Sequence, residues 1–363
     1  MKNIFYLLVA VVLISACNKN ELVIQGPIIP EPEVEVQIID SVQLNLLSLD
    51  IPRKSGDFLI YDFTARIPGF IWGCTYLEES ADEDMVLFSY NLATKDLKLI
   101  AAPIDLGLSN FQRIVAGPDG KLYMHSAGIL HNAIAVFDTN IRTWSSIEVA
   151  GLIGGFTVDE VNNTLWIAHH EGVSRYQNGE LFTFDDTNSN LQRIESGSNN
   201  SFFGFQLAVD KGGIVWYANQ NELYTFVNEE WSQHPLSPLS DRYIISHVVA
   251  SESEGVLINV PYESLLLLNK DTEIRNYNSI PALTNPPKSP LSLLDRVTDE
   301  NILYSHRDGF SFYNSLLDSV IQVDASNSLL PASNSMALKL DRDAEGNIWI
   351  GGHNILGTLA SEW

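Results

Sequence analysis

A short step of apolar and aromatic residues recurs seven times along this chain of 363 residues, about every 46 residues. The copies are centred on Trp72, Tyr123, Trp166, Trp216, Leu257, Leu303 and Trp349. A fixed period in this range is typical of repeat architectures, in which each unit buries its apolar face only against its neighbours. The period therefore constrains the fold more strongly than any other feature of the sequence.

Each copy carries the same local pattern, and the last copy shows it most clearly. Residues 338–341 alternate apolar and polar, which is typical of a strand with one buried face. Gly346 and Asn347 follow, and both residue types tolerate the positive φ that a tight turn requires. Residues 348–352 then form a second apolar segment that carries Trp349. The pattern predicts a hairpin whose second strand holds the bulky residue.

Two further short strands follow the hairpin in most copies, such as residues 173–176 and 181–184 in the third. Four short antiparallel strands in each unit of this length are typical of a propeller blade. We therefore predict an all-β fold, a seven-bladed β-propeller with four antiparallel strands per blade. The last copy has only three strands, and we expect residues 34–47 to supply the fourth and so close the ring.

The string from Asp341 to Gly352 resembles the two-component regulator propeller repeat, with its Gly-Asn-Ile-Trp-Ile-Gly core at residues 346–351. The third and fourth copies share this resemblance, and as a repeating unit it covers residues 57–363. The resemblance implies a β-propeller in an exported protein. It implies no single activity, because propellers host binding, sensing, lyase and hydrolase functions.

The first sixteen residues resemble a bacterial lipoprotein signal peptide. Lys2 precedes an apolar stretch, residues 4–14, that is too short to span a bilayer. Residues 14–16 then match the small-residue pattern before a lipidated cysteine, Cys17. The resemblance implies cleavage before Cys17 and its acylation. Asn18 is not the aspartate that retains such proteins at the inner membrane, so we expect an outer-membrane lipoprotein on the periplasmic or cell-surface face.

The domain organisation that follows is a signal peptide at residues 1–16, an acylated cysteine with an acidic, proline-containing tether at 17–33, and a propeller at 34–363. Proline and charge keep such a tether extended. The net charge of −24 excludes a nucleic-acid partner, since no cluster of Lys and Arg offsets it. We expect contact with the membrane through the lipid anchor alone.

We call the seven residues on which the copies are centred the hallmark residues. Five of the eight histidines follow a hallmark residue by two to four positions. Because the second strand of a blade ends at one rim of a propeller, we expect these side chains to gather there with one amide. The candidate rim residues are His125, His169, His170, Asn219, His306 and His353. Such a rim could bind a ligand or hold a divalent metal, with His169 and His170 the first candidates as ligands. A set of ordinary polar turn residues is the alternative interpretation.

The preferred functional prediction is a non-enzymatic binding module for a polymer, a peptide or a partner protein, with a protein or glycan as ligand. One alternative is a metal-assisted lyase or hydrolase, similar in architecture to propeller lyases that inactivate antibiotics. Another is a structural subunit of an outer-membrane complex. The hallmark residues Trp166, Trp216 and Trp349 are predicted to be buried between adjacent blades rather than to contact a ligand.

Overall fold

The structure is a computed structural model of the whole chain. It divides into two units by contact, residues 1–40 with residue 363, and residues 41–362, and every described residue belongs to the second. The described residues are 44–47, 59–77, 84–103, 111–126, 132–196, 199–201, 206–219, 222–234, 245, 247–250, 255–260, 264–268, 273–276, 292–296, 301–306, 309–314, 319–324, 330 and 338–359. The predicted signal peptide, Cys17 and the tether lie outside them.

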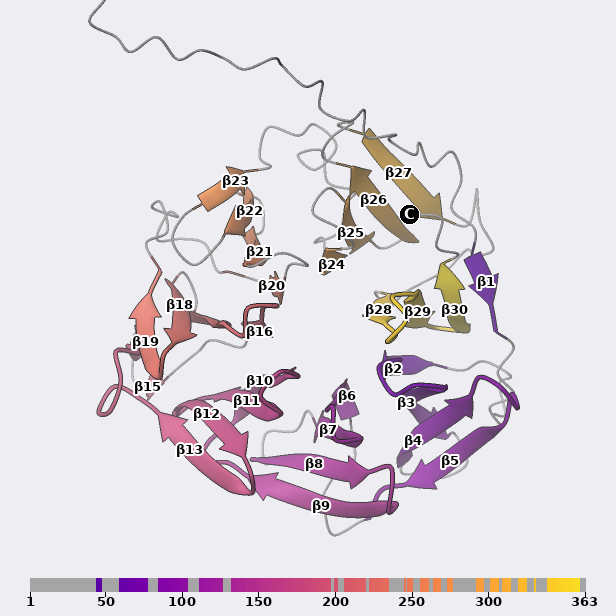
Figure 1. Cartoon of the computed structure of the whole chain (residues 1–363), viewed down its shortest axis with the longest axis horizontal. Coiled ribbons are helices and arrows are strands. Elements are labelled where there is room, and N and C mark those ends of the chain that lie inside the picture. The colour runs from indigo at the N-terminus through magenta and orange to yellow at the C-terminus, as the bar shows by residue number, and fades with distance from the viewer. Residues whose placement is uncertain are drawn as a thin grey trace, which may run out of the picture. The chain divides into compact units, whose positions relative to one another are not determined.

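The described residues form strands and no helix, as predicted (Figure 1). Seven antiparallel sheets have four strands each, and we number them I to VII in chain order. Sheet I contains β2 (Ile60–Thr64), β3 (Phe70–Leu77), β4 (Asp84–Asn91) and β5 (Leu97–Ala101). Sheet II contains β6 (Phe111–Ala116), β7 (Lys121–Ser126), β8 (Ala133–Asp138) and β9 (Thr143–Glu148). Sheet III contains β10 (Ile153–Asp159), β11 (Thr164–His169), β12 (Gly172–Gln177) and β13 (Glu180–Phe184).

Sheets IV to VI repeat this order. Sheet IV contains β16 (Gln206–Val209), β17 (Val215–Asn219), β18 (Glu222–Val227) and β19 (Glu230–Gln233). Sheet V contains β20 (His247–Ala250), β21 (Val256–Val260), β22 (Ser264–Leu268) and β23 (Glu273–Asn276). Sheet VI contains β24 (Ser292–Arg296), β25 (Asn301–His306), β26 (Gly309–Asn314) and β27 (Ser319–Asp324). A separate two-stranded ribbon joins β14 (Ile194–Ser196) to β15 (Asn199–Ser201).

Sheet VII takes strands from both ends of the described chain. It contains β28 (Lys339–Arg342), β29 (Ile348–Gly352) and β30 (Ile355–Leu359), and its outer strand is β1 (Leu44–Leu46). Strand β1 pairs antiparallel with β30, with Leu44 opposite Leu359, and the Leu47 amide donates to the Leu356 carbonyl over 2.7 Å. The part of the predicted closing segment before residue 44 lies outside the described residues.

An aspartate organises the turn between the first two strands in the clearest copies. In sheet IV one carboxylate oxygen of Asp210 accepts from the amides of Gly212 and Ile214, which holds the turn, and Gly213 adopts a φ of +79° within it. The other oxygen accepts from the Trp216 indole at 2.9 Å and from the Gly255 amide of sheet V at 3.0 Å. One buried side chain therefore fixes a turn, a core residue and the neighbouring sheet.

The hydrophobic core lies between successive sheets, as the repeat predicts. The buried clusters join sheets I and II, II and III, III and IV, IV and V, and VII and I. Trp166, Trp216 and Trp349 are 2%, 0% and 5% exposed and each belongs to one of these clusters, so the prediction that they are packing residues is confirmed. Each first strand also lies against the first strand of the next sheet, and β28 lies against β2 (Figure 1).

Among the described residues, no helix is long and apolar enough to cross a membrane.

Replacing Asp210 with alanine is expected to lower the free energy of unfolding by at least about 2 kcal/mol. The substitution leaves the buried Trp216 indole and the Gly255 amide without their acceptor, and an unsatisfied buried donor costs about 1–3 kcal/mol. Urea unfolding measures the change. Asp138→Ala is the matched control, because Asp138 accepts only from the amides of its own exposed turn. Equal losses in the two variants would contradict the role assigned to Asp210.

Candidate functional site

The structure places the predicted rim residues at the ends of second strands or just beyond them, but in unlike environments. His125 lies in β7 and is partly buried. His170 follows β11 and its amide donates to the Leu152 carbonyl. His353 follows β29 and forms an isolated bridge with Leu59. His306 ends β25, and its side chain lies outside the described residues.

His169 is part of the interior rather than of a surface. It is fully buried, and its Nε2 lies 2.7 Å from the Ser174 hydroxyl, which in turn contacts Thr183. Its Nδ1 accepts from the Glu171 amide at 3.3 Å. Both ring nitrogens are therefore engaged by one neutral tautomer, which favours a structural role in joining β11 to β12.

Asn219 is likewise buried, and its side-chain amide donates to the Gln192 carbonyl over 2.9 Å. In the part of the chain that the structure describes, no three His, Cys, Asp or Glu side chains come together as a metal site would require. A divalent metal at the rim stays a prediction, one to which the buried setting of His169 gives no support.

A cavity of about 470 Å³ lies along the first strands of the sheets. Strands β2, β6, β10, β16, β20 and β28 all contribute to its wall, and they face the central space in Figure 1. Five polar side chains occupy the same register position on five of these strands, each opposite the residue two places after a hallmark. We call them the polar layer: Asp62, Arg113, Gln206, His247 and Lys339.

The polar layer was missed by sequence reasoning, although a signal for it exists. Each of its members stands ten residues before the hallmark of its repeat, as Asp62 does before Trp72 and Lys339 before Trp349. The equivalent register positions in sheets III and VI hold the small residues Gly155 and Ser292. The predicted rim residue His125 lies on the neighbouring strand and pairs directly with Arg113.

Charges of both signs meet in the polar layer. Asp62 Oδ2 accepts from the Ile114 amide at 2.9 Å, and burial raises the pKa of its carboxyl against the opposing effects of Lys339, that hydrogen bond and Arg113. Burial also lowers the pKa of the Arg113 guanidinium, and Asp62 opposes this shift. Burial and the charges of Lys339 and Arg113 lower the pKa of His247, which favours its neutral form.

An ion-pair cluster occupies the other end of the cavity. Arg66, just after β2, contacts Glu160, just after β10, and its Nε lies 3.3 Å from Asp341 Oδ1 in β28. Asp341 Oδ2 also accepts from the Thr64 hydroxyl and the Ala65 amide, at 2.7 and 2.8 Å. These contacts join sheet I to sheets III and VII at the end of the first strands opposite the polar layer.

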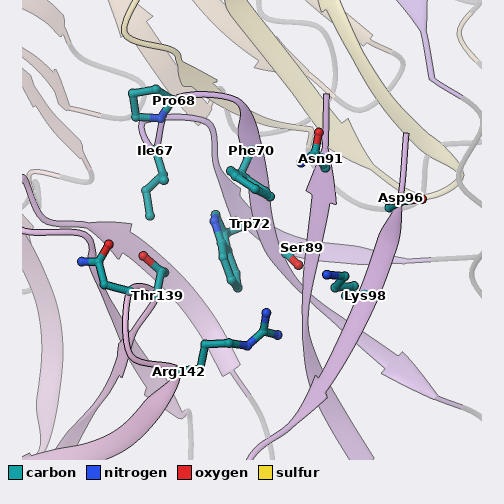
Figure 2. Close-up of a pocket in the computed structure, with 11 residues that line it drawn as sticks. Ile67, Pro68, Phe70, Trp72, Ser89, Asn91, Asp96, Lys98, Thr139 and Arg142 are labelled. Atoms are coloured by element: carbon teal, nitrogen blue, oxygen red, sulfur yellow. The ribbon is translucent and has the colours of Figure 1, made fainter. Parts of the chain in front are cut away.

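A second cavity, a groove of about 260 Å³, lies between sheets I and II (Figure 2). Its aromatic wall is formed by the partly buried Phe70 and by Trp72, which is 5% exposed and belongs to the core between these sheets; their ring centroids are 6.3 Å apart. Figure 2 shows Trp72 in the middle of the groove, with Phe70 beside it and Arg142 below. The remaining lining residues are Ile67, Pro68, Ser89, Asn91, Asp96, Lys98, Thr139 and Asn140.

Several polar groups of the groove are fixed by the turns that carry them. Asn91 Oδ1 accepts from the amides of Ala93 and Thr94, and the Thr139 hydroxyl donates to the Gly120 carbonyl. Arg142 and Lys98 are exposed and approach the groove from different sheets. The groove thus offers two cations and one carboxylate, Asp96, beside an apolar aromatic wall.

The fold is shared with the extracellular domains of one-component and hybrid two-component systems. One solved structure is the extracellular domain of BT4673 from B. thetaiotaomicron, described as a one-component or hybrid two-component system, at 16% identity and a TM-score of 0.59. Another is that of the hybrid two-component system BT3049 from the same organism, at 12% identity and a TM-score of 0.58. Each covers 88% of this chain, which spans 40% and 42% of those chains.

These neighbours bear out, at the level of fold, the resemblance to the two-component regulator propeller and the all-β, propeller-like architecture. No protein-family model matches the sequence, and no curated protein is significantly similar to it.

The stability of the protein is expected to fall between pH 7 and pH 5 because of His169. Burial, with a smaller effect of His170, lowers the pKa of His169 to about 4, against about 6.5 in an unfolded chain. Between these values the unfolded state binds more protons, so the free energy of unfolding decreases as the pH falls. Each pH unit below 6.5 corresponds to about 1.4 kcal/mol for this group.

The measurement is urea unfolding of the wild type and His169→Asn at pH 7, 6 and 5. The wild type should lose about 2 kcal/mol more than the variant over this interval. His353→Asn, at a partly exposed position, is the control and should follow the wild type. Parallel pH dependence of the wild type and His169→Asn would show that His169 is protonated equally in the two states.

Proposed function

We propose that the protein is an exported, non-enzymatic recognition module that binds a segment of a negatively charged glycan in the groove between sheets I and II. The observation that carries the proposal is the pairing of an aromatic wall with two exposed cations from neighbouring sheets. Aromatic faces pack against the apolar faces of sugar rings, and Lys98 and Arg142 would pair with acidic substituents.

The groove suits a segment of a longer molecule better than it suits a catalytic reaction. Its walls come from rigid hairpins: β4 and β5 on one side and the turn between β8 and β9 on the other. Two of its polar groups, Asn91 and Thr139, are held by hydrogen bonds to the backbone, so they are oriented before a ligand arrives. Preorganised polar groups of this kind favour binding because little side-chain entropy is lost.

The neighbouring structures support an extracellular or periplasmic location, and we propose that the anchor is a lipid on Cys17. Acyl chains partition into a bilayer, whereas a polypeptide whose full sequence has a net charge of −24 does not. Cys17→Ser is expected to move the protein from the membrane fraction to the soluble fraction of the envelope. Retention of this variant in the outer membrane would contradict the lipid anchor.

We also propose that the seven sheets are the blades of a closed propeller, with β1 as the closing strand. The pairing of β1 with β30 and the contact of β28 with β2 support this arrangement. Deleting residues 34–50 would expose β30 as an edge strand, so the truncated protein should aggregate or unfold with reduced cooperativity. An unchanged melting temperature and a monodisperse truncated protein would contradict closure by this segment.

Glycan binding is expected to depend on the two cations of the groove. Lys98→Gln and Arg142→Gln should each weaken binding to uronic-acid oligosaccharides about three- to tenfold, as expected for a partly exposed charge pair. A glycan microarray that includes neutral oligosaccharides, followed by calorimetric titration, makes the measurement. Lys211→Gln is the matched control, since Lys211 is exposed in a turn of sheet IV.

The outcome that would contradict the proposal is equal binding by the wild type, the two groove variants and the Lys211→Gln control. Binding of acidic peptides in preference to every glycan on the array would instead assign the groove to a protein ligand.

A further inference from the structure

The polar layer of the central cavity carries more positive than negative charge. Lys339, Asp62 and Arg113 come from sheets VII, I and II, whose first strands lie side by side. Among the described residues, no carboxylate lies within 4.0 Å of the Arg113 guanidinium or of the Lys339 ammonium. Two cations and one carboxylate therefore share the polar layer, whereas Arg66 is paired with Glu160 and Asp341 at the other end of the cavity.

The groups of the polar layer are held in place by their surroundings. The Asp62 carboxylate is committed to the Ile114 amide through Oδ2. The Arg113 guanidinium lies 5.5 Å from the centroid of the Phe156 ring of sheet III, which is a cation–π distance. A guanidinium presents paired N–H donors to a planar carboxylate, and Lys339 adds a point charge.

The polar layer carries one more positive than negative formal charge, because Arg113 and Lys339 share the single carboxylate of Asp62. One carboxylate replaces only part of the hydration that two cations lose in a cavity. Burial is the main cause that lowers the pKa of both Arg113 and His247, and the charges of Lys339 and Arg113 lower the pKa of His247 further. An anion placed between Arg113 and Lys339 would relieve this cost, which gives the cavity an intrinsic preference for negative ligands.

The size and composition of the cavity narrow the class of anion. About 470 Å³ falls within the range of small-molecule sites, about 300–1,000 Å³, and exceeds what a single inorganic ion would fill. Gln206 and His247, on the sheets across the cavity, add hydrogen-bonding groups of no net charge. The arrangement fits a carboxylate at one end of the ligand and uncharged polar groups at the other.

The two ends of the cavity differ in the residues that surround them, and this difference indicates where a ligand would enter. The cluster of Arg66, Glu160 and Asp341 spans the end at which the first strands finish. Gln206, His247 and Lys339 are the first residues of their strands, so the polar layer lies near the opposite end. A ligand that enters there meets the polar layer first.

We propose that the central cavity binds a small organic acid, whose carboxylate lies between Arg113 and Lys339 and whose uncharged polar groups contact Gln206 and His247. The site is separate from the groove between sheets I and II, and it does not depend on the glycan assignment of that groove.

The test is calorimetric titration of the full-length protein in detergent with succinate, malate and inorganic phosphate. Malate or succinate is expected to bind, and Lys339→Met should weaken that binding by at least about tenfold, as expected for the loss of a charge-assisted hydrogen bond. Asp62→Asn keeps the shape of the side chain and removes the opposing charge, so it should tighten binding several-fold. Lys211→Met, at an exposed turn position that does not line the cavity, is the control and should bind as the wild type does.

The opposite signs expected for Lys339→Met and Asp62→Asn separate a binding role from a structural one, because a variant that only damaged the fold would weaken binding in both cases. The melting temperature of each variant is measured alongside. Absence of binding by both organic acids, equal affinity in Lys339→Met and the wild type, or weaker binding in Asp62→Asn would overturn the proposal. Phosphate binding at least as tight as that of malate would overturn the assignment to an organic acid.

Discussion

The buried carboxylate of Asp210 is the interaction on which the architecture most visibly depends. A sheet of four short strands has little surface of its own, so its tight turn and its bulky core residue must both be satisfied within a few residues. Asp210 accepts four hydrogen bonds: two from its turn, one from the Trp216 indole and one from the next sheet. Asp343 likewise accepts from two amides of its own turn, those of Glu345 and Asn347, and from the indole of Trp349. Burial of a carboxylate is tolerated here because its acceptor capacity is fully used.

Departures from this arrangement show how the repeats diverge. In sheet III the turn is one residue longer. The second carboxylate oxygen of Asp159 accepts a hydrogen bond from the Asn162 side chain, and the buried Trp166 indole has no acceptor. That sheet is secured differently, by Arg175, which lies about 6 Å from three aromatic rings and pairs with Glu229 of sheet IV. In sheet I the equivalent of Asp210 is Arg66, and its guanidinium joins the cluster at the end of the central cavity instead. Repeats that lose one anchoring contact thus gain another, and the substituted position becomes free for a different use.

The fold could be predicted from the sequence because its signals are local. Alternation of apolar residues, turn residues at fixed offsets and a recurring Trp lie within about a dozen residues of one another. The sites could not be predicted in the same way. The groove joins Trp72 and Lys98 to Arg142 of another sheet, and no pattern in one repeat indicates which neighbour it will face. The rim prediction also treated every residue after a hallmark as a surface group. His169 is instead the last residue of β11 and pairs with Gly172, which turns its ring toward Ser174 and the interior. The members of the polar layer could have been found from the sequence, since each stands ten residues before a hallmark residue in five repeats. That they share one level of the cavity wall follows only from the strand register, which pairs Arg113 with His125.

The electrostatics of the molecule set a further condition on any ligand of the central cavity. The net charge of −24 produces a field that repels anions at a distance, so an acidic ligand gains no electrostatic acceleration of its approach. Its affinity must come from short-range contacts with Arg113 and Lys339, which line the cavity. An anion site of this kind discriminates by fit rather than by attraction, because nucleic acid and anionic lipid are repelled before they reach the cavity. Only a molecule small enough to enter can reach Arg113 and Lys339, so the acidic surface and the cations of the polar layer together select for size as well as charge.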